Sequence, residues 1–292
     1  MADIIPTETS NDVYVLKGTR GPHAAIRLMV QHWLYKDHFG WNIHPTIRAS
    51  ISPNRPIRMA DIATGQATFL MEEHPNLPPG SQSFGFDISP NMFPATKTLP
   101  QGLSLHIVDA ASEPFNVPQH LIGTFDIVNI RLLVACVKNN DPSSFLGNAM
   151  ALLKPGGYLQ WTEVFTPTHI LGASAETNET NPSASRLLLD PLLEKIGFPG
   201  WEDSWMNHLP AIFEEAGMGE VDVVQLGIPR REMWSSWGAN TLSYLRESLV
   251  EGDVERECLV EELEAEHASG VYAASEPRVV IARKAGRARS RF

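Results

Sequence analysis

Three aspartates stand at the ends of three successive apolar runs of the sequence. They are Asp61, Asp87 and Asp109, in the runs IRMADIA (57–63), SFGFDIS (83–89) and LSLHIVD (103–109). A carboxylate can offer one oxygen to each of two hydroxyl groups, so Asp87 suits the diol of a ribose and Asp109 suits the amino group of adenine. Gly65 lies in the turn of DIATGQATFL, before a helix whose first N–H groups can face an anionic ligand. The pattern therefore favours a ligand that contains adenosine.

A parallel sheet would bring these residues to one edge. The runs FDIVNIRLLV (125–134) and GYLQWTEVF (157–165) resemble the first three in being nearly continuously apolar, which is typical of strands buried on both faces. Later strands are expected at about 221–226 and 276–285. Segments of helical period alternate with the runs, so the sequence predicts a doubly wound α/β fold with a mostly parallel, Rossmann-like sheet of seven strands. Ligands of such sheets bind beyond the carboxyl ends of the strands.

Helical additions are expected around this sheet. Residues 1–55 contain a helix with Ile26, Met29, Val30, Trp33 and Leu34 on one face, which we expect to pack and to close the site. Residues 56–292 form the main domain, with cap insertions at about 166–203 and 229–270. Four tryptophans fall in this predicted roof, where they line an acceptor pocket or form plain core: Trp201, Trp205, Trp234 and Trp237.

The composition excludes several classes of protein. Of the 292 residues, 43% are hydrophobic and 20% charged, as in globular proteins, and the formal net charge of −11 argues against a nucleic-acid partner. Two cysteines and no apolar run of membrane-spanning length argue against a disulfide scaffold and a membrane protein, so a cytoplasmic location is expected. No HExxH or CxxC spacing supports a metal site.

The motifs resemble those of class I S-adenosylmethionine (SAM)-dependent methyltransferases. The resemblance rests on DIATG, FDIS, VDA, FDIVNIRLLVA and LLKPGGYLQWTE in that order, and is closer to the small-molecule methyltransferases of fungal secondary metabolism, through YVLKG, RLMVQHWLYKDHFGWNIHP and HLPAIFEEAGM. It implies SAM as cofactor, with Gly65 against its amino-acid part, Asp87 on the ribose, and Asp109 with Ala110 beside adenine. The other residues that it implies at the cofactor are Tyr14, Asp61, Thr64, Ile88, Asn129 and Arg131.

The cofactor turn departs from this resemblance at one position. Relatives commonly read ATGTG where this chain reads ATGQA, so Ala67 replaces a glycine and Gln66 replaces a smaller residue. If residue 67 needs a positive φ, alanine alters the turn or weakens binding, and if φ is negative one methyl group matters little.

Three residues are candidates for proton transfer or acceptor orientation. His32 can take a proton or bond a backbone carbonyl. His208 lies before a predicted helix where the acceptor can reach it, or is an exposed capping residue. Glu163 ends the fifth run and orients an amine or pairs with Arg131. Methyl transfer from a sulfonium mainly needs positioning and exclusion of water, so no dedicated base is required.

The leading hypothesis is a methyltransferase acting on O, N or S of a small natural product. An alternative is a methyltransferase-like enzyme that catalyses a non-methylating step, such as a cyclisation, an isomerisation or a pericyclic reaction, because fold does not determine function. A third is a non-catalytic, regulatory protein that binds SAM or a partner. The expected partner is a small molecule, without nucleic acid or membrane, and the chain is expected to be a monomer or a homodimer.

Overall fold

A computed structural model describes residues 20–164, 169–172, 197, 199–200, 202–247, 249 and 252–286. Its main element is a seven-stranded sheet in the order β3-β2-β1-β4-β5-β9-β7. All strands are parallel except β9, which pairs antiparallel with both β5 and β7. The strands of this sheet are β1 (Arg58–Ile62), β2 (Gln82–Asp87), β3 (Leu103–Ile107), β4 (Phe125–Arg131), β5 (Leu153–Val164), β7 (Met218–Gln225) and β9 (Pro277–Lys284).

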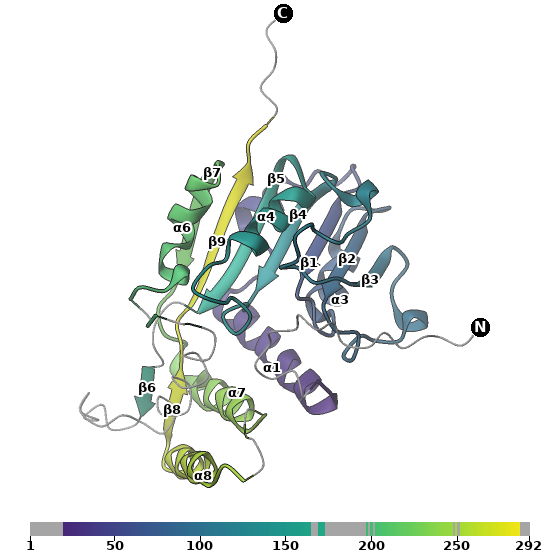
Figure 1. Cartoon of the computed structure of the whole chain (residues 1–292). Helices are drawn as coiled ribbons and strands as arrows, with labels where there is room; N and C mark the ends of the chain where they lie inside the picture. The colour runs from purple at the N-terminus through teal and green to yellow at the C-terminus, as the bar shows by residue number, and fades with distance from the viewer. Residues whose placement is uncertain are drawn as a thin grey trace, which may run out of the picture.

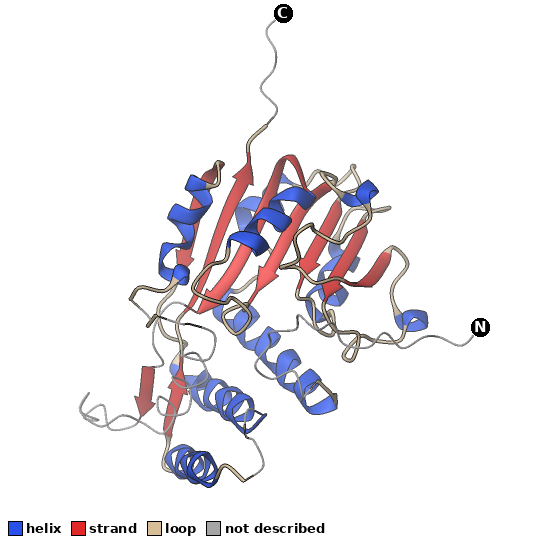
Figure 2. Cartoon of the chain, viewed as in Figure 1, coloured by secondary structure: helices blue, strands red, loops and turns tan. Residues whose placement is uncertain are grey.

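Helices cover both faces of the sheet and a further group lies at the carboxyl ends of the parallel strands (Figures 1 and 2). The α-helices are α1 (Pro22–Phe39), α2 (Pro45–Ser50), α3 (Thr68–Glu73), α4 (Ser143–Leu152), α6 (Trp205–Glu215), α7 (Trp234–Glu247) and α8 (Val254–Ala268). Short 3-10 turns occur at His74–Asn76, Thr96–Thr98, Gln119–Leu121 and Arg231–Met233. The predicted α/β fold with seven strands is confirmed.

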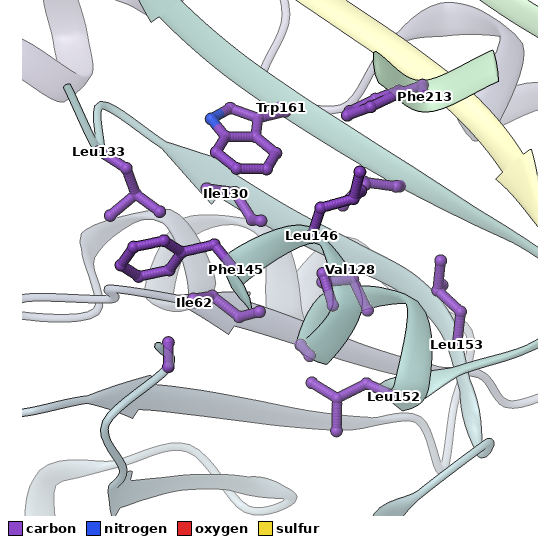
Figure 3. Close-up of a cluster of buried hydrophobic side chains, with 14 of the residues drawn as sticks. Ile62, Val128, Ile130, Leu133, Phe145, Leu146, Leu152, Leu153, Trp161 and Phe213 are labelled. Atoms are coloured by element: carbon purple, nitrogen blue, oxygen red, sulfur yellow. The ribbon is translucent and has the colours of Figure 1, made fainter. Parts of the chain in front are cut away.

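Alternating side chains of the strands build two cores. Val128 and Ile130 of β4 join Trp161 of β5 in the core under α4 and α6, where Phe145 and Phe213 close over them (Figure 3). The intervening positions face the other side, where residues from α1, α2 and α3 pack against the sheet. Both faces of the central strands are therefore buried, which is why their sequences read as continuous apolar runs.

The cap at the carboxyl ends differs from a purely helical addition. It contains α7 and α8, but also a two-stranded antiparallel sheet formed by β6 (His169–Gly172) and β8 (Val271–Ala274). Most of the predicted insertion at 166–203 lies outside the described residues, as do Trp201 and the N-terminal residues up to 19.

The predicted packed face of the first helix is wrong for four of its five residues. Leu34 is buried, whereas the other four have 38–57% of their surface exposed: Ile26, Met29, Val30 and Trp33. The buried face of α1 carries Arg27, His32 and Tyr35 instead. The apolar residues of the sequence pattern lie on the outer face of α1, whereas the inner face includes polar side chains that line a cavity. Hydrophobic periodicity therefore predicts the wrong face.

Candidate active site

A cavity of about 320 Å³ lies where β1, β2, β3 and β4 end, roofed by α1 and α7. The three strand-end aspartates, Asp61, Asp87 and Asp109, all line it. The other predicted cofactor residues in its wall are Thr64, Gly65, Ile88, Ala110 and Arg131. Tyr14 lies outside the described residues. Three acids that are far apart in the sequence thus meet at one edge of the sheet, as the strand-end pattern predicted.

Backbone hydrogen bonds join the glycine turn to the neighbouring strand. Thr64 N donates to Phe86 O over 3.0 Å, and Gly65 N donates to Asp87 Oδ2 over 2.8 Å. Ser89 N donates to Asp87 Oδ1 over 3.1 Å, so each carboxylate oxygen of Asp87 already accepts one bond. Asp87 thus supports the glycine turn and the start of the following loop through both of its oxygens.

Ala67 ends this turn in the left-handed region, with φ 61° and ψ 23°. Of the two possibilities that the sequence left open, the structure shows the positive φ. This conformation costs an alanine about 1–2 kcal/mol. Ala67 N donates to Thr64 O over 2.8 Å, and the Ala67 side chain is fully buried in the core. The bond to Thr64 O and the burial of the methyl group offset part of this cost.

The other substituted residue of the turn has a role of its own. Gln66 Nε2 donates to Ala25 O of α1 over 2.5 Å. Asn240 of α7 donates to Arg27 O over 2.9 Å, and Arg27 Nε donates to Glu247 Oε2 over 2.9 Å. Helix α1 is thus bonded to the glycine turn on one side and to α7 on the other.

Asp61 belongs to a row of polar side chains that crosses three neighbouring strands. Thr64 Oγ1 donates to Asp61 Oδ2 over 2.6 Å, and Asn129 Nδ2 donates to Asp61 Oδ1 over 2.7 Å. Gln160 Nε2 donates to Asn129 Oδ1 over 3.0 Å and to Asn42 O over 2.7 Å. Burial raises the pKa of Asp61, and the bonds from Thr64 and Asn129 oppose that rise. Asn129 lies behind Asp61, outside the cavity wall, and orients its carboxylate.

His32 lies in the cavity wall, but both of its ring nitrogens are engaged. Arg131 Nη2 lies 2.9 Å from Nδ1, and Glu72 Oε2 lies 2.5 Å from Nε2. Because Arg131 can only donate, Nδ1 is the acceptor and Nε2 carries the proton. Burial and the nearby Arg131 lower the pKa of His32 to about 4. The structure gives His32 a neutral imidazole whose lone pair is occupied, which is a poor arrangement for a general base.

Glu163 is buried and stabilises the loop that follows β4. Its Oε1 accepts from Leu133 N over 2.5 Å and from Trp161 Nε1 over 3.1 Å. Burial raises the pKa of Glu163 to about 8, so the carboxyl group is largely protonated at neutral pH. No direct pair with Arg131 occurs, and Glu163 does not line the cavity. It holds the loop that carries Leu132, Leu133 and Val134, which do line it.

The remaining candidates lie away from the cavity. His208 is exposed on α6, which packs on the sheet, and is not in the cavity wall. Trp205 packs against Trp161 at a tilt of 56°, with 5.3 Å between ring centroids, and the centroid of the Trp237 ring lies 5.2 Å from that of Tyr35. Trp234 donates to Pro229 O over 2.8 Å. These three tryptophans form structure rather than an acceptor pocket, because none of them reaches the cavity.

Several cavity residues were missed by the sequence analysis. They are Arg27, Leu28, Gln31 and Tyr35 of α1, Met92, the loop residues 132–136, and Asn240, Thr241 and Tyr244 of α7. The α1 residues recur at helical spacing, so a search for a mixed polar and apolar face would have found them. The cavity residues of α7 belong to no recognisable sequence motif, so nothing in the sequence marks them as part of a site.

The described part of the chain holds no group of three or more His, Cys, Asp or Glu side chains arranged to bind a metal ion. Among the same residues, no helix is both long enough and apolar enough to cross a membrane.

Residues 60–159 match the family model of a methyltransferase domain. Over this segment the chain is therefore similar to proteins that carry a methyltransferase domain. The matched segment covers β1 to the middle of β5 and includes all three strand-end aspartates.

Curated fungal proteins are similar over about half of the chain. N-methyltransferase tcpN of Claviceps purpurea is 31% identical over 139 residues, covering 47% of this chain and 47% of the relative. N-methyltransferase verN of Clonostachys rogersoniana is 30% identical over 146 residues, covering 50% and 49%. The matches thus span about half the length of these relatives.

Solved structures share the fold at low identity. Phosphoethanolamine N-methyltransferase 2 of Haemonchus contortus, solved with phosphomonomethylethanolamine and S-adenosylhomocysteine, has a TM-score of 0.54 and 16% identity, covering 93% of this chain and 60% of that one. A putative sarcosine dimethylglycine methyltransferase of Galdieria sulphuraria has a TM-score of 0.50 and 13% identity, covering 87% and 84%.

Proposed function

We propose that this protein binds SAM and transfers its methyl group to a nitrogen atom of a small natural product. The observation that carries the proposal is the meeting of Asp61, Asp87 and Asp109 in one cavity of a methyltransferase domain. When bound, SAM supplies an electrophilic methyl group on a sulfonium, a good leaving group.

The residues present fit this cofactor. Asp87 lines the cavity at the end of β2, where the ribose diol is expected, and Asp109 and Ala110 line the part expected to hold adenine. Asp109 Oδ1 accepts from Ala111 N over 2.9 Å, which fixes its side chain at the end of β3. Asp61 and Arg131 supply opposite charges toward the amino-acid end.

Two observations favour nitrogen as the acceptor atom. Relatives named N-methyltransferase match about half of this chain. In addition, His32 has no lone pair free to remove a proton. A neutral amine attacks with its own lone pair and loses its proton afterwards, whereas an alcohol needs a base before or during attack. The chain's contribution is then to orient the acceptor and to exclude water under α1 and α7.

Calorimetric titration of ligand-free protein with SAM and S-adenosylhomocysteine tests the cofactor assignment. Micromolar binding, about −8 kcal/mol, is expected, and Asp87→Ala should lose about 1.5–3 kcal/mol of it. Part of that loss comes from the Gly65 N contact, so Asp87→Asn, which keeps one acceptor oxygen, is the milder companion variant.

A screen of small amines, thiols and phenols with methyl-labelled SAM tests the reaction. Transfer of label to amines is expected. Tight SAM binding with product formation but no label transfer would favour a non-methylating reaction, and binding with no reaction would favour a regulatory role.

A further inference from the structure

We propose that His32 and Glu72 are positioning residues that hold the guanidinium of Arg131 toward the carboxylate of the cofactor's amino-acid end. The inference rests on the proposed function, because it assigns a role within the same SAM site. It concerns three elements, α1, α3 and β4, that meet beside the cavity.

The geometry fixes Arg131 from two directions. Its Nη2 donates to His32 Nδ1 over 2.9 Å, and its guanidinium carbon lies 5.4 Å from the centroid of the Phe69 ring. Arg131 nevertheless belongs to the cavity wall. A guanidinium has five N–H donors, and among the described residues only His32 accepts one, so donors remain for a ligand.

The choice of a neutral acceptor matters for the charge of Arg131. A carboxylate in place of His32 would pair with the guanidinium and compete with an anionic ligand. A neutral imidazole orients the guanidinium and leaves its charge available. Because the proton of His32 must then lie on Nε2, an acceptor is needed there, and Glu72 Oε2 supplies it over 2.5 Å.

Glu72 does not bring an uncompensated negative charge to the cluster. Lys36 of α1 forms an ion pair with Glu72 Oε1, and Asn42 Nδ2 donates to Oε2 over 2.9 Å. Burial raises the pKa of Glu72, but the bonds from Lys36, His32 and Asn42 outweigh it and lower that pKa overall. The charge of Glu72 is thus matched by Lys36, and the positive charge of Arg131 faces the cavity.

Asp61 completes a pair of opposite charges suited to a zwitterion. Asp61 on β1 lies opposite Asn129 on β4, and Arg131 follows two residues later on the same face of the sheet. Burial lowers the pKa of Arg131, and the nearby Asp61 carboxylate opposes that fall. The amino-acid end of SAM carries an ammonium and a carboxylate, which this pair matches.

The alternative is that the His32–Glu72 contact only fastens α1 to α3. A purely structural role would lower stability and weaken all adenosine ligands equally. A positioning role affects only ligands that carry the carboxylate. Decarboxylated SAM, which keeps the adenosine, sulfonium and amine, separates the two.

The experiment measures the dissociation constants of SAM and decarboxylated SAM by calorimetry with the full chain. The wild type should prefer SAM by roughly 10- to 100-fold, as expected for a hydrogen-bonded charge pair. Arg131→Gln should abolish that preference by weakening SAM alone. Asp87→Asn is the matched control, because it should weaken both ligands by the same factor.

Two substitutions of His32 test the positioning role itself. His32→Asn places an oxygen near the position of Nδ1 and should keep much of the preference. His32→Gln extends toward Glu72 and leaves Arg131 without its acceptor, so the preference should fall by about 10-fold or more. Glu72→Gln should cause a smaller fall, since it weakens the hold on His32.

The outcomes separate the two proposals. If the wild type binds neither ligand, the proposed function fails. If it binds SAM and decarboxylated SAM equally, the cofactor assignment stands and the role of Arg131 is refuted. If the preference persists in His32→Gln while both ligands bind more weakly, His32 is structural. If both His32 variants lose the preference equally, an acceptor at the position of Nδ1 does not hold Arg131 and the positioning role is refuted.

Discussion

Ala63 and Ala67 share a backbone conformation that disfavours side chains. Their φ angles are 56° and 61°, but Ala63 is exposed and Ala67 is fully buried. Glycine would relieve about 1–2 kcal/mol of strain at either position, against about 0.4–1 kcal/mol from the greater freedom of the unfolded chain. At Ala67 it would also remove a packed methyl group, worth about 0.8 kcal/mol.

Ala63→Gly should therefore raise the free energy of unfolding by about 0.5–1 kcal/mol, whereas Ala67→Gly should leave it nearly unchanged. Urea denaturation of both variants checks this. Equal stabilisation of the two would mean that the Ala67 methyl group adds no packing energy.

Glu163 should make the protein less stable as the pH rises. Burial raises its pKa to about 8, so the folded state holds a proton that the unfolded state releases near pH 4.5. The contribution of Glu163 to the free energy of unfolding is fully present below about pH 4.5 and is lost as the pH rises toward 8. Glu163→Gln keeps an acceptor for Leu133 N and Trp161 Nε1 and should flatten this decline. Thermal melts of both proteins from pH 5 to 8 measure it, and parallel curves would contradict the assignment.

His32 should act in the opposite direction at acidic pH. Its pKa of about 4 is below the ordinary 6.5, so between these pH values the unfolded state binds a proton at His32 and the folded state does not. Stability is therefore lost as the pH falls from about 6.5 to 4, by up to about 3 kcal/mol. His32→Asn cannot titrate and should lose less stability over this interval. Chemical denaturation at pH 7, 5.5 and 4.5 provides the comparison.

At the scale of elements, strands were easier to predict than faces of helices. The runs at 57–63, 83–89 and 103–109 are recognisable as strands because a strand buried on both faces is almost continuously apolar. The packed face of α1 was misassigned because its cavity side carries Arg27, Gln31 and His32. The β6–β8 pair was missed because each strand has four residues and its partner lies about a hundred residues away.

Helix α1 depends on Gln66 for its contact with the glycine turn. Gln66→Ala removes the bond to Ala25 O and should increase hydrogen exchange in the first turns of α1, and weaken SAM binding by about 0.5–1.5 kcal/mol. Arg230→Ala is a suitable control, because it removes an exposed ion pair with Asp37 near the other end of the same helix. Similar exchange in both variants would show that the turn does not hold α1.

At the scale of the whole molecule, the sheet depends on its last strand. Strand β9 lies between β5 and β7, and β7 has no other strand partner in the described sheet (Figure 1). A chain that stops after Glu276 should leave β5 with an open edge and β7 unpaired, and should aggregate. A chain that stops after Gly286 keeps β9 and should melt like the full chain. Size-exclusion chromatography and thermal melting distinguish them.

The position of β9 has a consequence for how the protein is made. During synthesis the ribosome releases β1 to β5 first, and these strands can pair among themselves while the rest emerges. Strand β7, which follows α6, cannot join the sheet until β9 (Pro277–Lys284) has left the exit tunnel. The newborn chain therefore passes through an interval in which the edge of β5 is bare, and this interval is when a chaperone would protect it most.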